Sequence, residues 1–134
     1  MSAQIKYIDH INEITIGQLH GFFVGWKLPI TSECHYEILR GSTHFIVALD
    51  ENEDKAIGFI TALSDSVLSA FIPLLEVLPQ YKNRGIGSEL LRRMLEKLDN
   101  ISNIDLTCDP DLQPFYERFK MARSSGMILR KQNR

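Results

Sequence analysis

The stretch that decides the fold reads Leu75-Glu76-Val77-Leu78-Pro79-Gln80-Tyr81-Lys82-Asn83-Arg84-Gly85-Ile86-Gly87-Ser88. Its first residues end a long apolar run typical of a β-strand, and its glycines open an amphipathic pattern that predicts a helix over 86–98. The first turn of a helix leaves backbone N–H groups unpaired and carries partial positive charge. Gly85 and Gly87 have no side chain to block a phosphate and tolerate a positive φ, while Lys82 and Arg84 add charge. The stretch therefore predicts a strand, a turn suited to a pyrophosphate, and a helix.

Two common glycine-rich phosphate sites do not fit this stretch. The sequence contains no G-x-x-x-x-G-K-[ST], so a P-loop is excluded. Ser88-Glu89-Leu90 supplies no third glycine, and the strands before it are expected to be antiparallel, so a dinucleotide fold is excluded as well. A lone G-x-G also opens helices that only pack closely. The turn therefore needs a second motif before it indicates a function.

The residues before this stretch predict two helices and an antiparallel meander. A strand is expected over 5–8. A helix capped by Thr15 should run through Leu19, Phe22 and Phe23, and a second, capped by Thr31 or Ser32, should end at Gly41. The three strands of the meander are expected to be joined by short polar turns, and the last of them to be buried on both faces. These strands cover 43–49, 56–63 and 67–78.

The residues after the long helix predict strand, helix and strand. A strand is expected over 104–107, a helix from near Gln113, where Pro114 is tolerated in the first turn, and a last strand over 127–129. Helices and strands thus alternate around the meander. The sequence predicts an α/β (α+β) fold with a mixed, largely antiparallel central sheet flanked by helices.

Length and composition limit the remaining classes. A chain of 134 residues fits one domain, 1–134, and 44% hydrophobic with 24% charged residues is ordinary for a globular protein. The net charge of −2 gives no overall attraction to nucleic acid or to an anionic membrane. Without a signal-peptide pattern or an apolar run of ~20 residues, a cytoplasmic location with reduced Cys34 and Cys108 is expected. No metal is expected, because metal-ligand spacing is missing from His20, His35 and His44.

A second motif supports the first and points to a family. It reads Asp109-Pro110-Asp111-Leu112-Gln113-Pro114-Phe115-Tyr116-Glu117-Arg118-Phe119. Lys82-x-x-Gly85-x-Gly87 resembles the coenzyme A signature of the GNAT N-acetyltransferases, Q/R-x-x-G-x-G/A, and the second motif resembles that family's N-x-x-A-x-x-F-Y-E-x-x-G-F helix. Order and spacing also agree, and the resemblance covers nearly the whole chain. Lys82 replaces the usual glutamine or arginine, and Asp109 replaces the usual asparagine. Phe119-Lys120-Met121 lacks the glycine-phenylalanine pair.

The resemblance implies the GNAT fold, whose splayed central strands bind coenzyme A, with acetyl-CoA as cosubstrate. It implies that the backbone of Leu75, Glu76 and Val77 pairs with the pantetheine arm, and that Val77 lies where the strand separates from its neighbour. It implies a general acid, Tyr116, beside the thioester sulfur. The other residues implied to contact the cofactor are Lys82, Asn83, Arg84, Gly85, Ile86, Gly87, Ser88 and Asp109. The implied reaction transfers acetyl to a primary amine through a tetrahedral intermediate.

Several features stay open from the sequence. The general base is Asp105, Glu76 or a water chain, because Phe71 occupies the position where some family members carry a glutamate. Trp26, with Phe22 and Phe23, either lines the acceptor pocket or belongs to the core. The acceptor class is undetermined, and a homodimer is the working hypothesis for assembly. The alternative function is a catalytically inactive acetyl-CoA-binding sensory or regulatory module; the presence of Tyr116 favours the enzyme.

Overall fold

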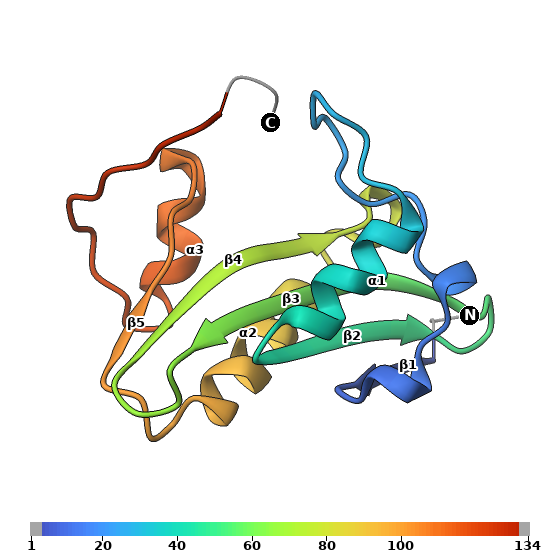
Figure 1. Ribbon diagram of the computed structural model, residues 1–134, viewed down its shortest axis with the longest axis horizontal. Coiled ribbons are helices and arrows are strands. Elements are labelled where there is room, and N and C mark those ends of the chain that lie inside the picture. Colours follow the sequence, from blue (N-terminus) through green and yellow to red (C-terminus); the bar gives the residue numbers. More distant parts are fainter. Residues whose placement is uncertain (1–3, 132–134) are drawn as a thin grey trace.

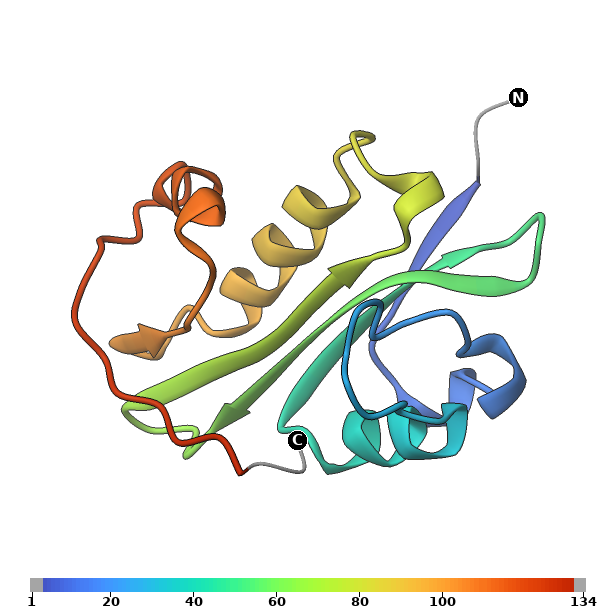
Figure 2. The ribbon, with the colours of Figure 1, turned by 90° about the horizontal axis from the view of Figure 1, so that it is seen from above.

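The computed structural model describes residues 4–131, which form a five-stranded sheet with helices on both faces (Figures 1 and 2). The strands follow the order β1-β2-β3-β4-β5; neighbours are antiparallel except β4 and β5, which are parallel. The strands are β1 Ile5–Ile8, β2 His44–Asp50, β3 Lys55–Ser64, β4 Ser69–Val77 and β5 Asn103–Asp105. The α-helices are α1 Ser32–Gly41, α2 Ile86–Lys97 and α3 Gln113–Glu117. The predicted mixed, largely antiparallel sheet is therefore confirmed.

The sheet separates two apolar layers, because side chains alternate between its faces. On one face, α2 buries its apolar stripe against the inner strands. On the other face, α1 and the chain before it cover a cluster centred on Phe59 and Leu39 (Figure 2). The buried residues of α2 and its C-cap are Ile86, Leu90, Leu91, Met94 and Leu98. The helix predicted from the periodicity of 86–98 is confirmed.

Gly58 on β3 sets how closely α2 approaches the sheet. A Cβ atom placed at Gly58 would lie 3.2 Å from the Glu76 carbonyl oxygen, 3.2 Å from Leu90 Cδ1 and 3.3 Å from Ile86 Cγ2. These contacts are tighter than ordinary packing, and one of them is to backbone. The missing side chain therefore allows the first turn of α2 to pack directly onto the ends of β3 and β4.

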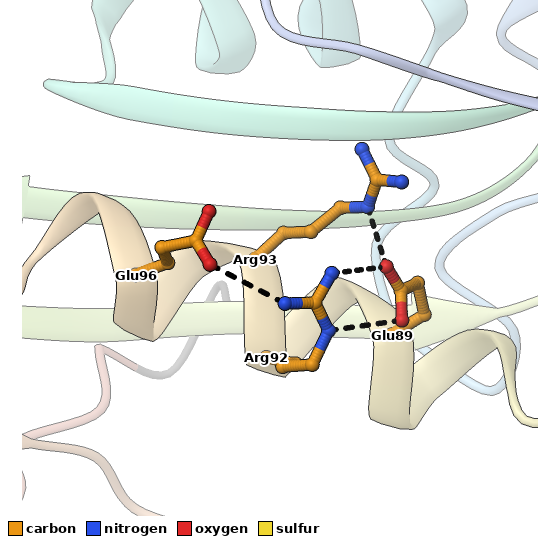
Figure 3. Close-up of polar contacts among 4 residues, drawn as sticks. All are labelled: Glu89, Arg92, Arg93 and Glu96. Atoms are coloured by element: carbon orange, nitrogen blue, oxygen red, sulfur yellow. Dashed lines mark hydrogen bonds and ion pairs between the residues drawn. The ribbon is translucent and has the colours of Figure 1, made fainter.

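A cluster of charged side chains lies on the outer surface of α2 (Figure 3). Glu89 accepts hydrogen bonds from Arg92 Nη2 at 2.7 Å and from Arg93 Nε at 2.6 Å, and Arg92 also reaches Glu96 at 3.3 Å. The bonds from Arg92 and Arg93 lower the pKa of Glu89 to about 2. Arg93 in turn lies over the ring of Tyr7, 4.3 Å from its centroid. The cluster thus connects the helix to β1.

The helix predicted from Thr15 through Phe23 is wrong. The structure has only a short 3₁₀ turn, Ile16–Gln18, after Thr15, and the chain then becomes irregular. Gly21 has φ +88° and Phe23 has φ +62°, both outside the helical region. The aromatic side chains of this segment pack around His35 and Phe59 instead of forming a helical stripe. The α1 prediction is confirmed, because the Thr31 hydroxyl caps the helix by accepting from Cys34 N–H at 3.0 Å.

Two strand predictions near the other end of the sheet are also wrong. Residues 127–129 do not form a strand; their side chains are exposed and none of their backbone groups is paired within residues 4–131. The predicted burial of 67–78 on both faces fails, because Phe71 and Pro73 are exposed and residues 74–77 are half-buried. β5 ends at Asp105, so within residues 4–131 the part of β4 after Phe71 has β3 as its one neighbour in the sheet. No helix within residues 4–131 has the length and apolarity to cross a membrane.

Candidate active site

β4 and its neighbour β5 separate after Phe71, the third residue of β4 (Figure 1). Their last Cα partners are Phe71 and Asp105, and residues 72–77 continue along β3 alone. The β3–β4 register shifts at the same place, since Thr61 faces Leu74 while Leu63 faces Phe71. This places one extra residue in β4, a β-bulge, next to Pro73, which has no N–H to donate to a neighbour. The bulge bends β4 away from β5. The two strands therefore separate after Phe71, six residues before Val77, the position that the resemblance implied.

Backbone groups of β4 face the gap that β5 leaves. Leu78 N–H donates to the Ile57 carbonyl of β3 at 2.9 Å. Because backbone groups alternate between the two edges of a strand, Glu76 also faces β3, whereas Leu75 and Val77 present their N–H and C=O groups to the gap. Two of the three backbone positions implied by the resemblance are thus free for a ligand, and Glu76 is not one of them.

The first turn of α2 opens at the same gap. Gly85 has φ +80° and Asn83 has φ +65°, so the turn uses the left-handed conformation at two positions. Hydrogen bonding within the helix begins with Glu89 N–H donating to the Gly85 carbonyl at 3.0 Å. The N–H groups of residues 86–88 therefore have no acceptor in the helix. Such a turn attracts anions.

Gly87 has an ordinary φ but faces the space between β4 and α3. A Cβ placed there would lie 3.8 Å from Val77 Cγ2 and 4.0 Å from Phe115 Cζ. These are ordinary contacts, so the glycine is not required for packing in the free protein. The observation fits a cradle that a bound group fills. The second helical motif lies directly beside the glycine turn, as this contact of Phe115 shows.

A buried hydrogen bond that the sequence analysis missed anchors the glycine turn. Tyr81 hydroxyl donates to Asp50 Oδ2 at 2.7 Å, and Asp50 Oδ1 accepts from the N–H groups of Asn52 and Glu53. The Tyr81 bond lowers the pKa of Asp50 and raises that of Tyr81. Arg84 lies over the Tyr81 ring, 5.1 Å from its centroid. Asp50 is the last residue of β2, before a polar turn, and only its partner Tyr81, 31 residues away, reveals its burial.

Tyr116 lies on α3 and lines a cavity of about 800 Å³ together with Asp105, Cys108 and Phe71. Its side chain is half-buried, and burial, followed by the nearby Cys108, raises the pKa of the phenol. Burial and the charges of Asp109 and Asp111 also raise the pKa of the Cys108 thiol. Both groups are therefore held protonated near neutral pH. The structure brings two of the predicted catalytic residues, Tyr116 and Asp105, to one cavity.

Glu76, the third predicted catalytic residue, lies on the opposite face of the sheet from α2. Its Oε1 accepts from Phe23 N–H at 2.9 Å and its Oε2 from Val24 N–H at 3.3 Å. Each carboxylate oxygen thus holds the irregular chain that precedes α1. These two hydrogen bonds explain how a loop with positive φ at Phe23 keeps its position.

A second, smaller cavity of about 190 Å³ lies next to this loop and is lined by His35, Phe22 and Phe23. Burial lowers the pKa of His35 to about 4, so its ring is neutral at physiological pH. Trp26 packs edge-on against Phe23, with ring centroids 5.2 Å apart, but is half exposed and does not line the cavity. Within residues 4–131, no group of three or more His, Cys, Asp or Glu side chains is arranged to hold a metal ion.

Comparison with known proteins agrees with this geometry. Residues 13–121 match the model of the acetyltransferase (GNAT) family. A solved structure from Deinococcus radiodurans R1, described as a candidate acetyltransferase, is 42% identical with a TM-score of 0.92, over 96% of this chain and 90% of its own. A GNAT-family acetyltransferase of Streptococcus pneumoniae TIGR4 is 25% identical with a TM-score of 0.77, over 96% and 99%.

A sequence relative supports the same grouping. An uncharacterised N-acetyltransferase of Pyropia yezoensis is 29% identical over 101 residues, which are 71% of this chain and 56% of the relative. The chain thus spans little more than half the length of that relative. From the matched family model and the shared fold, the chain belongs to the GNAT family of acetyltransferases.

Proposed function

We propose that this chain is a single N-acetyltransferase domain that transfers the acetyl group of acetyl-CoA to a primary amine. The observation that carries the proposal is the separation of β4 from β5 beside the open first turn of α2. In this arrangement the backbone of Leu75 and Val77 would hydrogen-bond to the amides of pantetheine. The N–H groups of residues 86–88 would donate to the pyrophosphate. Lys82 adds positive charge, and Gly87 leaves the space that the cofactor occupies.

Direct transfer fits the site better than an acetyl-cysteine intermediate. A cysteine nucleophile acts as the thiolate, which needs positive neighbours or a base. Burial raises the pKa of the Cys108 thiol, the charges of Asp109 and Asp111 raise it further, and the opposing effect of Arg123 is smaller. The amine nitrogen therefore attacks the thioester carbon itself, which gives a tetrahedral oxyanion. Collapse of that oxyanion forms the amide and breaks the C–S bond.

Tyr116 serves the departing thiolate as general acid. Its raised pKa keeps the phenol protonated at neutral pH, so it has a proton to share with the sulfur as the C–S bond breaks. The phenolate then regains a proton from water in the open cavity. The hydroxyl has no hydrogen-bond partner among the described residues, which leaves it free for this contact.

The amine must lose its own proton, and we propose that water carries it away. Glu76 is a poor base, because both of its oxygens accept backbone hydrogen bonds from Phe23 and Val24. Asp105 lines the cavity, but its side chain is exposed to solvent. The kcat/KM for the amine should therefore rise with pH as the free amine becomes abundant, with the same profile in Asp105→Asn.

The proposal is tested by a turnover screen that detects free thiol from acetyl-CoA with polyamines, aminoglycosides, amino acids and peptides. Release of thiol with one class of amine, and identification of its N-acetyl product by mass spectrometry, is the expected result. Tight binding of acetyl-CoA without turnover of any amine, up to alkaline pH, would instead identify a sensory module and contradict the enzyme.

A further inference from the structure

A buried histidine near the start of α1 has an unused hydrogen-bonding atom. His35 is 1% exposed, and its ring packs among aromatic side chains, with its centroid 4.3 Å from that of Phe59 and 5.1 Å from that of Phe23. Its Nε2 atom is buried and has no hydrogen-bond partner within residues 4–131. A buried polar atom without a partner is costly, and an apolar side chain at this position would not carry that cost. The ring therefore calls for a ligand that hydrogen-bonds to it.

His35 lines the cavity of about 190 Å³, which is far larger than a single buried water requires. One water molecule occupies about 30 Å³ in the liquid. Part of the lining is apolar and comes from Leu19, Phe22 and Ile30, while hydroxyl groups come from Thr31 and Ser32. A ligand of this cavity should accordingly have both a polar and an apolar part.

The N-terminus of α1 opens on the same cavity, since its cap, Thr31, and its first residue, Ser32, both line it. The Thr31 hydroxyl accepts from Cys34 N–H at 3.0 Å, and the Thr31 carbonyl accepts from His35 N–H at 2.9 Å. The N–H groups of Ser32 and Glu33 therefore have no acceptor in the helix. The helix dipole adds partial positive charge at this end. Two unrelated features, the helix end and the buried ring, thus meet at one cavity.

The charges around the cavity favour an anion. Of the residues within 4–131 that line it, none is Asp or Glu, and the ionisable ones are two histidines, His20 and His35. Glu33, in the first turn of α1, is exposed and does not line the cavity. Donors without an opposing carboxylate are the usual surroundings of a bound carboxylate.

We propose that this cavity binds a small carboxylate that carries an apolar group. One carboxylate oxygen would accept from His35 Nε2–H, and the other from the N–H groups of the first turn of α1. The apolar group would pack against Phe22 and Ile30. The carboxylate belongs either to the amine acceptor or to a separate small molecule, and only the first of these sources rests on the proposed function. Glu76 of β4 holds one wall of the cavity by accepting from Phe23 N–H at 2.9 Å, so the cavity is connected to the strand beside the gap.

The first test is a titration of the full chain at pH 7 with isocaproate, followed by NMR of isotope-labelled histidine side chains. Isocaproamide is the matched probe, because it keeps the apolar group and replaces the carboxylate by a neutral amide. Saturable shifts of the His35 signals with isocaproate are expected, while the signals of His10 and His44, which do not line the cavity, stay in place. Signals of His35 that do not move through the millimolar range, or that respond equally to the amide, would overturn the proposal.

A pair of variants tests the position of the carboxylate. Ser32→Asp places a negative charge at the cavity and suits the first turn of a helix, so α1 should stay folded. Repulsion between the two carboxylates should weaken isocaproate binding by about 10-fold or more. Ser66→Asp is the matched control, because it adds the same charge in the exposed β3–β4 turn, where aspartate tolerates the φ of +66°. Equal affinity in the two variants would contradict the proposed position.

Leucine distinguishes the two sources, because it adds an α-amine to the skeleton of isocaproate. If the carboxylate belongs to the acceptor, leucine should shift the His35 signals and should also be converted to N-acetylleucine with acetyl-CoA, as mass spectrometry detects. If it belongs to a separate ligand, leucine and isocaproate should shift the same signals without any acetylation. Both results support the site. A protein that acetylates other amines but gives no His35 shift with either carboxylate would refute the site and leave the proposed function standing.

Discussion

The bond between Tyr81 and Asp50 provides a test of how the glycine turn is held in place. Tyr81→Phe removes the hydroxyl but keeps the ring on which Arg84 lies. A hydrogen bond to a charged group contributes about 1.5–3 kcal/mol. Because Asn52 and Glu53 still donate to Asp50, we expect the lower part of that range, about 1.5–2 kcal/mol. In a domain of this size the loss corresponds to a decrease of about 5 °C or more in Tm.

The pH dependence of this loss has a definite sign. The Tyr81 bond lowers the pKa of Asp50 below its ordinary 3.8, so its stabilisation is present above that value and disappears as pH falls through the lowered pKa. The pKa of Tyr81 is raised above its ordinary 10.0, so stabilisation is present below that value and is lost as pH rises through the raised pKa. The difference between wild type and Tyr81→Phe should therefore be largest between the two ordinary values.

Urea unfolding followed by circular dichroism, at a series of pH values, measures this difference. Tyr36→Phe is the matched control, because Tyr36 is half-buried and its hydroxyl makes no hydrogen bond within residues 4–131. The reasoning is refuted if Tyr81→Phe costs no more than the control at pH 7. It is also refuted if the difference persists unchanged at a pH where Asp50 is protonated.

Three further substitutions test the proposed chemistry. Tyr116→Phe should lower kcat by ~100- to 10,000-fold while the circular dichroism spectrum stays native. Near-complete activity, in a reaction limited by the chemical step, would show that Tyr116 only packs. Cys108→Ala should keep kcat within a few-fold, since a loss as large as that of a missing nucleophile would indicate an acetyl-cysteine. Glu76→Gln should loosen the loop at Phe23, which should raise KM for the amine and leave the pH profile of kcat unchanged. A loss of turnover at neutral pH that recovers at high pH would instead identify Glu76 as the base.

Elements defined by local pattern could be predicted from the sequence. The period of apolar residues predicts α2, the cap at Thr31 predicts α1, and short polar turns predict the meander. Gly85 and Gly87 predict the open N-terminus of α2 in the same way, because they are adjacent in the chain to the start of the helix. These predictions depend on neighbours within a few residues.

Features that depend on distant partners could not be predicted. The resemblance already implied that β4 separates from its neighbour, but the position of that separation follows from a bulge that only pairing with β3 defines. The burial of Asp50 depends on Tyr81, and the orientation of Glu76 depends on a loop 53 residues away. The apolar pattern of 127–129 does predict strand character, but a strand also needs a pairing partner, and within residues 4–131 this segment pairs with none.

The central claim is that the gap between β4 and β5, with the first turn of α2, binds coenzyme A. Calorimetric titration of coenzyme A into the wild type, Gly87→Val and Gly41→Val tests it most directly. Gly41 at the end of α1 has open space and an ordinary φ, so its valine variant controls for the loss of a glycine. A valine at Gly87 projects between Val77 and Phe115, where the cofactor is proposed to lie. Loss of binding in Gly87→Val alone, with native circular dichroism, is predicted; unchanged affinity in that variant would contradict the site.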